Sequence, residues 1–182
     1  MKTLLPLLAA AAVLGPAGAV WLHAQDDQLV VVQDESSMER RIESFLKANH
    51  QFVINEKQDG DDLWLELPMK GDPMPAYKIT IDTQSLNKDS AGRIIERGVR
   101  IQALTGIKVP ETRRGAVLRV LNDFNRDKVF AAVYIDNDDE LMLDWTLNVM
   151  APGLATEYVY DAVYREDKLW RELYPLVTAA LR

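Results

Sequence analysis

Residues 136–140 are the first stretch whose side-chain types and spacing could support chemistry. Asp136, Asp138, Asp139 and Glu140 crowd carboxylates together, and carboxylate oxygens are the hard ligands that Ca²⁺ prefers. An EF-hand loop counted from Asp136 would need Gly at its sixth position and Glu at its twelfth, where this chain has Leu141 and Leu147. We therefore expect a solvated hairpin turn and no metal site, and we interpret the acidic turn at 59–62 in the same way.

Three further carboxylates, Glu66, Asp82 and Asp144, lie inside predicted strands. Two facing carboxylates can serve as acid and base in a hydrolase, and a carboxylate on a covered face would have a raised pKa. Antiparallel sheets commonly leave one face in water, so we expect these three side chains on an open face. A small carboxylate-dependent hydrolase or ligand-binding protein of the cell envelope stays as the alternative function.

Composition excludes several classes of site. The 182 residues contain no cysteine and two histidines, His23 and His50, so disulfides, thiolate ligands and a cysteine nucleophile are excluded. A histidine-rich metal site or a Ser-His-Asp triad would rest on one or two imidazoles. Acidic residues outnumber basic ones by 28 to 21, which argues against nucleic acid as a partner. We expect no cofactor.

A possible contact surface lies on the last predicted helix. On a continuous helix Tyr160 and Tyr164 share one ridge with Lys168 and Arg171, and tyrosines beside cations are enriched in protein interfaces. We predict a partner-binding ridge there. The alternative is that Tyr160 packs against the N-terminal helix.

The elements that must position these residues are organised around Pro110 to Met150. Apolar residues recur at helical spacing from Val117 to Phe124, after which the pattern alternates over 129–135 and 141–149. The first pattern predicts a helix and the second a two-stranded hairpin.

Other elements follow from caps and alternation. Ser36 and Glu39 have the spacing of a capping box and predict that a helix begins at Ser36. Alternation predicts strands at 52–54, 63–67 and 77–81, and it favours a strand over a helix for 93–109. A last helix over 156–181 should be kinked or split at Pro175. Trp64, Trp145 and Trp170 are expected to be core residues.

The N-terminus has the layout of a secretory signal peptide over residues 1–24. Lys2 precedes an apolar run, and small residues follow near Ala19 and Ala24, where cleavage is expected. An uncleaved membrane anchor is the alternative, and it would be the only membrane contact. We interpret 25–35 as a tether or a short edge strand and 36–182 as one domain, located in the periplasm or secreted.

The helix–hairpin stretch resembles the YbjN-like family of bacterial proteins. The resemblance is based on Val109-Pro110-Glu111, on Leu121-Asn122-Asp123-Phe124-Asn125 and on the acidic turn between two strands. The family is described as sensory transduction regulators, with a fold similar to type III secretion chaperones. The resemblance implies an α+β domain with an antiparallel sheet of about five or six strands against N-terminal, central and C-terminal helices.

These expectations combine into one functional hypothesis. The resemblance implies no catalytic residues, and the family and the secretion chaperones are usually cytosolic, whereas we expect this chain to be exported. We expect an exported, non-enzymatic, regulatory or chaperone-like module that binds a protein or peptide, with a homodimer as a further possibility.

Overall fold

The computed structural model describes residues 28–30, 34–128 and 131–182, so the predicted signal peptide lies outside the described residues. The helices are α2 (Glu35–His50), α3 (Glu111–Asp127) and α4 (Glu157–Leu181). The strands are β1 (Gln28–Leu29), β2 (Asn55–Asp59), β3 (Asp62–Met69), β4 (Tyr77–Lys88), β5 (Ile94–Lys108), β6 (Ala132–Ile135), β7 (Glu140–Val149) and β8 (Leu154–Ala155).

Six strands form one antiparallel sheet in the order β2-β3-β4-β5-β7-β6, and β1 pairs separately with β8. The α+β fold, the strand over 93–109 and the helix followed by a hairpin are confirmed. Strands β4 and β5 have 12 and 15 residues and form the long centre of the sheet.

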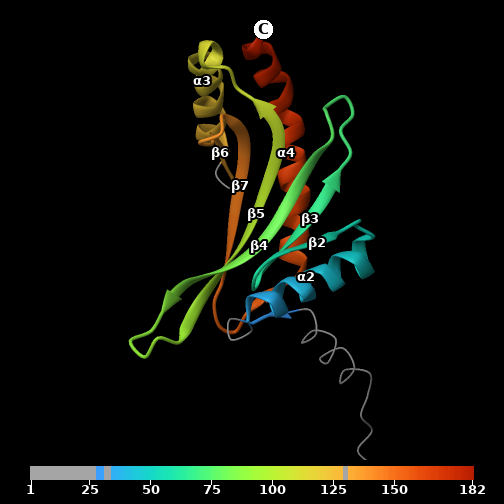
Figure 1. Ribbon diagram of the computed structural model, residues 1–182, viewed down its shortest axis with the longest axis vertical. Coiled ribbons are helices and arrows are strands. Elements are labelled where there is room, and N and C mark those ends of the chain that lie inside the picture. The colour runs from blue at the N-terminus through green and yellow to red at the C-terminus, as the bar shows by residue number, and fades with distance from the viewer. Residues whose placement is uncertain (1–27, 31–33, 129–130) are drawn as a thin grey trace, which may run out of the picture.

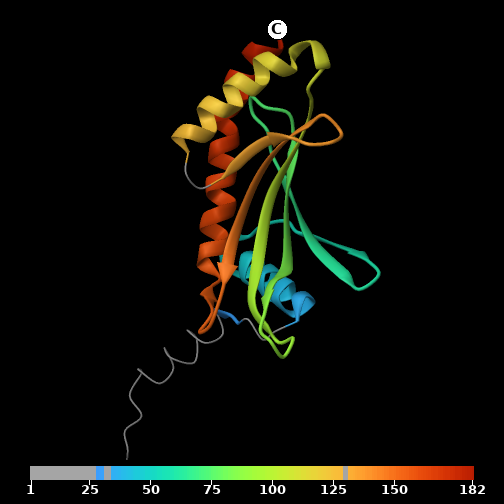
Figure 2. The ribbon, with the colours of Figure 1, turned by 90° about the vertical axis from the view of Figure 1, so that its left-hand side faces the viewer.

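The described helices cover one face of the sheet, and the other face is open (Figures 1 and 2). Helix α2 packs on β3 and β4, α4 packs on β5 and β7, and α3 contacts α4 and β6. Alternate strand residues point into this layer, and Ile79, Ile81, Ile101 and Leu143 are fully buried there. Because side chains alternate along a strand, the intervening polar residues must lie on the open face.

The start of α2 differs from the predicted capping box. Asp34 is the N-cap, and its carboxylate accepts the backbone N–H of Ser37 at 2.9 Å. Glu39, expected to reach back to Ser36, is instead fully buried against the sheet. The prediction was wrong because Asp34 caps a helix as well as Ser36 does. Glu39 is not available to the cap because it packs against the sheet.

Two other expectations need correction. The strand predicted at 52–54 begins three residues later, at Asn55, and its five residues are all exposed. Helix α4 continues through Pro175 to Leu181, so the predicted split is wrong, whereas the predicted kink stays a prediction. Pro175 lies on the exposed side of the helix, where the ring and the carbonyl that loses its partner meet solvent.

The segment predicted as a tether or a short edge strand contains the short strand β1 and takes part in the fold. Leu29 is fully buried and lies opposite Leu154 in the β1–β8 pair. Within the described residues, no helix has the length and apolar character needed to cross a membrane.

Candidate peptide-binding edge of the sheet

The strand carboxylates Glu66, Asp82 and Asp144 lie on the open face, and two of them have cationic partners. The Lys78 ammonium is 3.2 Å from the Glu66 carboxylate. The Arg100 guanidinium donates from Nε to Asp144 Oδ2 at 2.8 Å and from a second nitrogen to the same oxygen. The side chains are spread over three strands of an open surface, so they do not form a closed catalytic cleft.

Arg100 organises the centre of the open face. It also donates to the Tyr134 hydroxyl at 3.3 Å, and Gln102 donates to that hydroxyl at 2.9 Å. The hydrogen bond and charge of Asp144 raise the pKa of Arg100, while partial burial and the charge of Asp144 raise the pKa of Tyr134. In this network the Tyr134 hydroxyl keeps its proton, and the charge of Arg100 compensates the charge of Asp144. The network lies at the β5–β7–β6 side of the face.

Asp82 lies in a small depression of about 230 Å³ with Asp62, Trp64 and Arg100 among its lining residues. Burial raises the pKa of Asp82, and the nearby charges of Asp62 and Glu35 raise it further. Trp64 is thus a half-buried residue of the open face, which corrects the expectation of a core residue. Trp170 is fully buried, as expected.

The acidic turn uses its carboxylates internally. Asp136 Oδ1 accepts the N–H groups of Asp138 and Glu140 at 2.9 and 2.8 Å, and Asp139 forms an ion pair with Arg114. Among residues 28–30, 34–128 and 131–182, no group of three or more acidic or histidine side chains is placed to hold a metal ion.

The structure brings the predicted tyrosine ridge together only in part. Tyr160 and Tyr164 stack with ring centroids 6.4 Å apart, and Tyr164 is 57% exposed. Tyr160 is half-buried because its ring stacks on His50 at the end of α2, at 3.5 Å between centroids. The alternative that Tyr160 packs against the N-terminal helix is therefore the observed arrangement.

The two cations of the ridge point to different surroundings. Arg171 donates to Asp167 at 2.9 Å and to the carbonyls of Lys70 and Asp72, in the connection from β3 to β4. Lys168 is exposed and borders a cavity beside Trp145. The ridge as a contact surface stays a prediction.

A different feature stands out at the β6–β7 side of the sheet, where β6 covers only half of β7. Its four residues pair with Leu141 to Asp144. Among the described residues no strand pairs with β7 beyond Asp144 on that side. Figure 2 looks onto this side, and below β6 no other described segment lies in front of β7.

Asn125, on α3, closes the outer edge of β6. Its side-chain amide donates to the Val133 carbonyl at 2.8 Å, and its side-chain oxygen accepts the Val133 N–H at 2.9 Å. One side chain thus satisfies both backbone groups that a further strand would use. The unpaired N–H and C=O groups of an edge strand can pair with a strand of another chain, and proteins commonly block such edges.

The bonds to Asn125 also show which groups of β7 face outward. Val133 points its backbone groups away from β7, so Val133 and Leu143 are a pair without mutual hydrogen bonds. Such pairs alternate with hydrogen-bonded pairs along an antiparallel ladder, so the neighbouring pair, Ala132 and Asp144, is hydrogen-bonded. Outward direction alternates along a strand, so the N–H and C=O groups of Thr146 and Asn148 also point outward. Neither residue has a backbone partner on that side among the described residues.

Glu39 closes a comparable gap next to β4. Thr83 lies two residues beyond Ile81, the last residue of β4 that pairs with β3. Glu39 Oε1 accepts the Thr83 N–H at 3.0 Å and the Thr83 hydroxyl at 3.2 Å. Burial outweighs these hydrogen bonds and raises the pKa of Glu39 to about 7.

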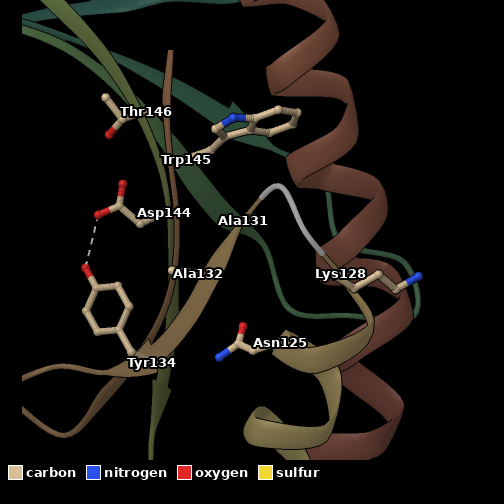
Figure 3. A pocket seen from close by; sticks show the side chains of 8 residues that line it. All are labelled: Asn125, Lys128, Ala131, Ala132, Tyr134, Asp144, Trp145 and Thr146. Atoms are coloured by element: carbon tan, nitrogen blue, oxygen red, sulfur yellow. Dashed lines mark hydrogen bonds between the residues drawn. The ribbon is translucent and has the colours of Figure 1, made fainter. Parts of the chain in front are cut away.

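A cavity of about 740 Å³ lies beside the unpaired part of β7, and Figure 3 shows the eight side chains that line it. Tyr134, Asp144 and Thr146 point to one side of the strand, whereas Trp145 points toward α4. Trp145 is half-buried and packs at the margin of the core, so the expectation of a core residue is met only in part. The site therefore has backbone donors and acceptors between a polar wall and a wall that contains the Trp145 ring.

Sequence reasoning missed Asn125, Thr146 and Asn148 as functional residues. Asn125 belongs to the motif used for the family resemblance, but nothing local shows that its amide meets Val133. A short first strand in a predicted hairpin with a longer second strand is the one signal that could have indicated an uncovered edge.

Comparison with known proteins agrees with this fold. The family model YbjN, described as "Putative bacterial sensory transduction regulator", matches residues 84–164, which include Asn125, β6 and β7. No match was found among curated proteins.

Two solved structures are similar to this chain. The crystal structure of YbjN from E. coli has a TM-score of 0.51 and 15% identity, over 83% of this chain and 94% of that one. An uncharacterized protein from Methanothermobacter thermautotrophicus has a TM-score of 0.47 and 13% identity, over 79% of this chain and 99% of that one. The YbjN family model thus matches residues 84–164, and the six-stranded α+β fold of this chain is similar to that of the E. coli YbjN structure.

Proposed function

We propose that this YbjN-like chain is an exported, non-enzymatic module that binds an extended segment of a protein or peptide as an additional strand along β7. Strand addition uses the main-chain hydrogen bonds of the sheet for affinity and alternate side chains for specificity. The family description as a regulator is consistent with a protein partner.

One observation carries this proposal. The outward N–H and C=O groups of Thr146 and Asn148 lack backbone partners among the described residues, beside a cavity of about 740 Å³. The neighbouring edge of β6 is closed by Asn125. The opposite edge, β2, is exposed along its whole length and has charged residues, which disfavour pairing.

A carboxylate-dependent hydrolase is the less favoured function. Asp144 and Glu66 form ion pairs with Arg100 and Lys78 on an open face, whereas an acid–base pair needs two carboxylates that face each other across a cleft. Asp82 has a raised pKa, but its depression holds only about 230 Å³.

Export is a separate part of the proposal, based on the signal-peptide layout of residues 1–24. Mass spectrometry of the protein purified from cells checks it. We expect a mature N-terminus after Ala19 or Ala24 in the periplasmic or secreted fraction. An intact Met1 in the cytoplasmic fraction would contradict export without affecting the binding site.

The binding site is tested by two substitutions at one position. Thr146→Pro removes an outward N–H and leaves the β5–β7 ladder intact, because residues 145 and 147 point their backbone groups to β5. Thr146→Val is the matched control, since it changes the side chain and keeps the N–H. Pull-down from an envelope extract should recover the same partner with wild type and Thr146→Val, and at least about tenfold less with Thr146→Pro.

Further arms assign the surface. A photo-crosslinking residue at position 148 should label the partner, and one at Lys57 on β2 should not. If Thr146→Pro recovers as much partner as wild type and the double variant Tyr160→Ala and Tyr164→Ala recovers none, the partner binds the tyrosine ridge and not the edge of β7. A wild-type dimer in light scattering that Thr146→Pro makes monomeric would identify the partner as a second copy.

A further inference from the structure

We infer that the bound segment presents an acidic side chain, Glu or Asp, toward α4 at the level of Trp145. This inference rests on the proposed strand addition along β7. It concerns the chemistry of the partner, and it follows from the charges that line the helix side of the edge.

Side-chain alternation determines where an added strand places its residues. A strand hydrogen-bonded to β7 would send every second side chain to the same face as Trp145 and the other side chains to the same face as Thr146. The Trp145 face is toward α4 (Figure 3). A side chain of the added strand on that face meets Trp145 on one side and α4 on the other.

The helix side contains a pocket of about 160 Å³ with a surplus of positive charge. Its lining residues are Lys128, Trp145, Arg165, Lys168, Leu169 and Glu172. Lys128 and Glu172 neutralise each other across a 2.7 Å ion pair. Lys168 is exposed and has no ion pair among the described residues, so its ammonium is left uncompensated.

This surplus is local. The chain as a whole has a formal net charge of −7. Asp161, which lies one helical turn before Arg165 on α4, does not line the pocket. A Glu side chain would lay its methylene groups on Trp145 and Leu169 and bring its carboxylate to the ammonium of Lys168. The apolar contact and the ion pair would then be made by one residue.

The opposite face sets a different requirement. There Asp144 is already neutralised by Arg100, and Tyr134 and Thr146 offer hydroxyl groups. Among the described residues beside Thr146 on that face, the charges of Arg100 and Asp144 compensate each other, so the bound segment should alternate acidic or apolar residues toward α4 with uncharged polar residues on the other side.

A library of random linear peptides displayed on phage tests the inference with the full chain as bait. Selection on wild type should enrich extended sequences with Glu or Asp at alternate positions. Lys168→Glu should abolish that enrichment and favour Lys or Arg instead. Lys88→Glu, at an exposed position near the β4–β5 turn, makes the same charge change and should leave the enrichment as in wild type.

One selected peptide is then measured beside its Glu→Gln version. Replacing Glu by Gln should weaken binding to wild type by about tenfold and have little effect with Lys168→Glu. Added salt should weaken the Glu peptide more than the Gln peptide, because exposed charges are screened.

The outcomes separate the two proposals. Peptides that bind wild type and Thr146→Val but lose binding with Thr146→Pro, yet show no acidic preference, would overturn the inference and leave strand addition intact. Peptides that bind Thr146→Pro as well as wild type would overturn strand addition itself. Acidic peptides that depend on both the position-146 N–H and Lys168 support both.

Discussion

Glu166 is a fully buried acid on the face of α4 that packs on the sheet. Neither carboxylate oxygen has a hydrogen-bond partner among the described residues, and the nearby backbone of Ala103 lowers the pKa by less than burial raises it. Burial dominates and raises the pKa of Glu166 to about 8. The protein therefore keeps a proton on Glu166 at neutral pH, as it does in part on Glu39.

The raised pKa of Glu166 predicts that stability falls as pH rises. The folded state keeps a proton that the unfolded chain releases near pH 4.5, so the stabilisation is complete below that pH and is lost as pH rises to about 8. Glu166→Gln has no such proton. We expect it to match wild type within about 1 kcal/mol at low pH and to exceed it by about 5 kcal/mol above pH 8, measured by urea unfolding. An unchanged pH dependence would refute this assignment.

At the scale of elements, α3 does more than cover the sheet, because its Asn125 replaces a missing strand beside β6. The uncovered part of β7 begins where that replacement ends. The length of β6 and the position of one amide thus determine how much of the sheet edge a partner can use.

Asn125→Ala should destabilise the protein by about 2 kcal/mol, because it leaves the N–H and C=O of Val133 without partners at a buried position. Hydrogen exchange at the Val133 amide should become faster, and urea unfolding should shift to lower concentration. Asn122→Ala, at an exposed position one turn earlier on α3, is the control and should change stability by less than about 0.5 kcal/mol. Equal effects would show that the amide contacts contribute nothing specific.

At the scale of the whole molecule, the N-terminal segment and the last strands are joined. Leu29 is fully buried, β1 pairs with β8, and His50 at the end of α2 stacks on Tyr160 near the start of α4. The beginning and end of the domain therefore stabilise each other around one core.

Because β1 and the end of the domain pack together, we expect Leu29→Ala to lower the free energy of unfolding by about 2–5 kcal/mol. This is the range for truncation of a buried leucine in a packed core. Val53→Ala is the control, since Val53 is 67% exposed and its truncation should have little effect. Denaturant unfolding of the two variants measures the difference. A loss below about 1 kcal/mol for Leu29→Ala would mean that the segment acts only as a tether, which is one of the two possibilities predicted from the sequence.

The sequence by itself determined the local order of this protein. Apolar periodicity of 3.6 and 2 residues specified α3, α4 and the β6–β7 hairpin, and alternation specified β5, because the period of burial is set by backbone geometry alone. The sequence did not determine the first residue of α2, because Asp34 and Ser36 are both good N-cap residues. The packing of the chain selected Asp34.

Tertiary structure decided everything that depends on two distant residues meeting. That Asn125 satisfies Val133, that Glu39 satisfies Thr83 and that Tyr160 stacks on His50 could not be seen in any one segment. The unpaired edge of β7 is of the same kind, because a strand has an open edge only in relation to its neighbours. Local patterns record which side of an element is buried, whereas the partner that buries it is chosen by the packing of the whole chain.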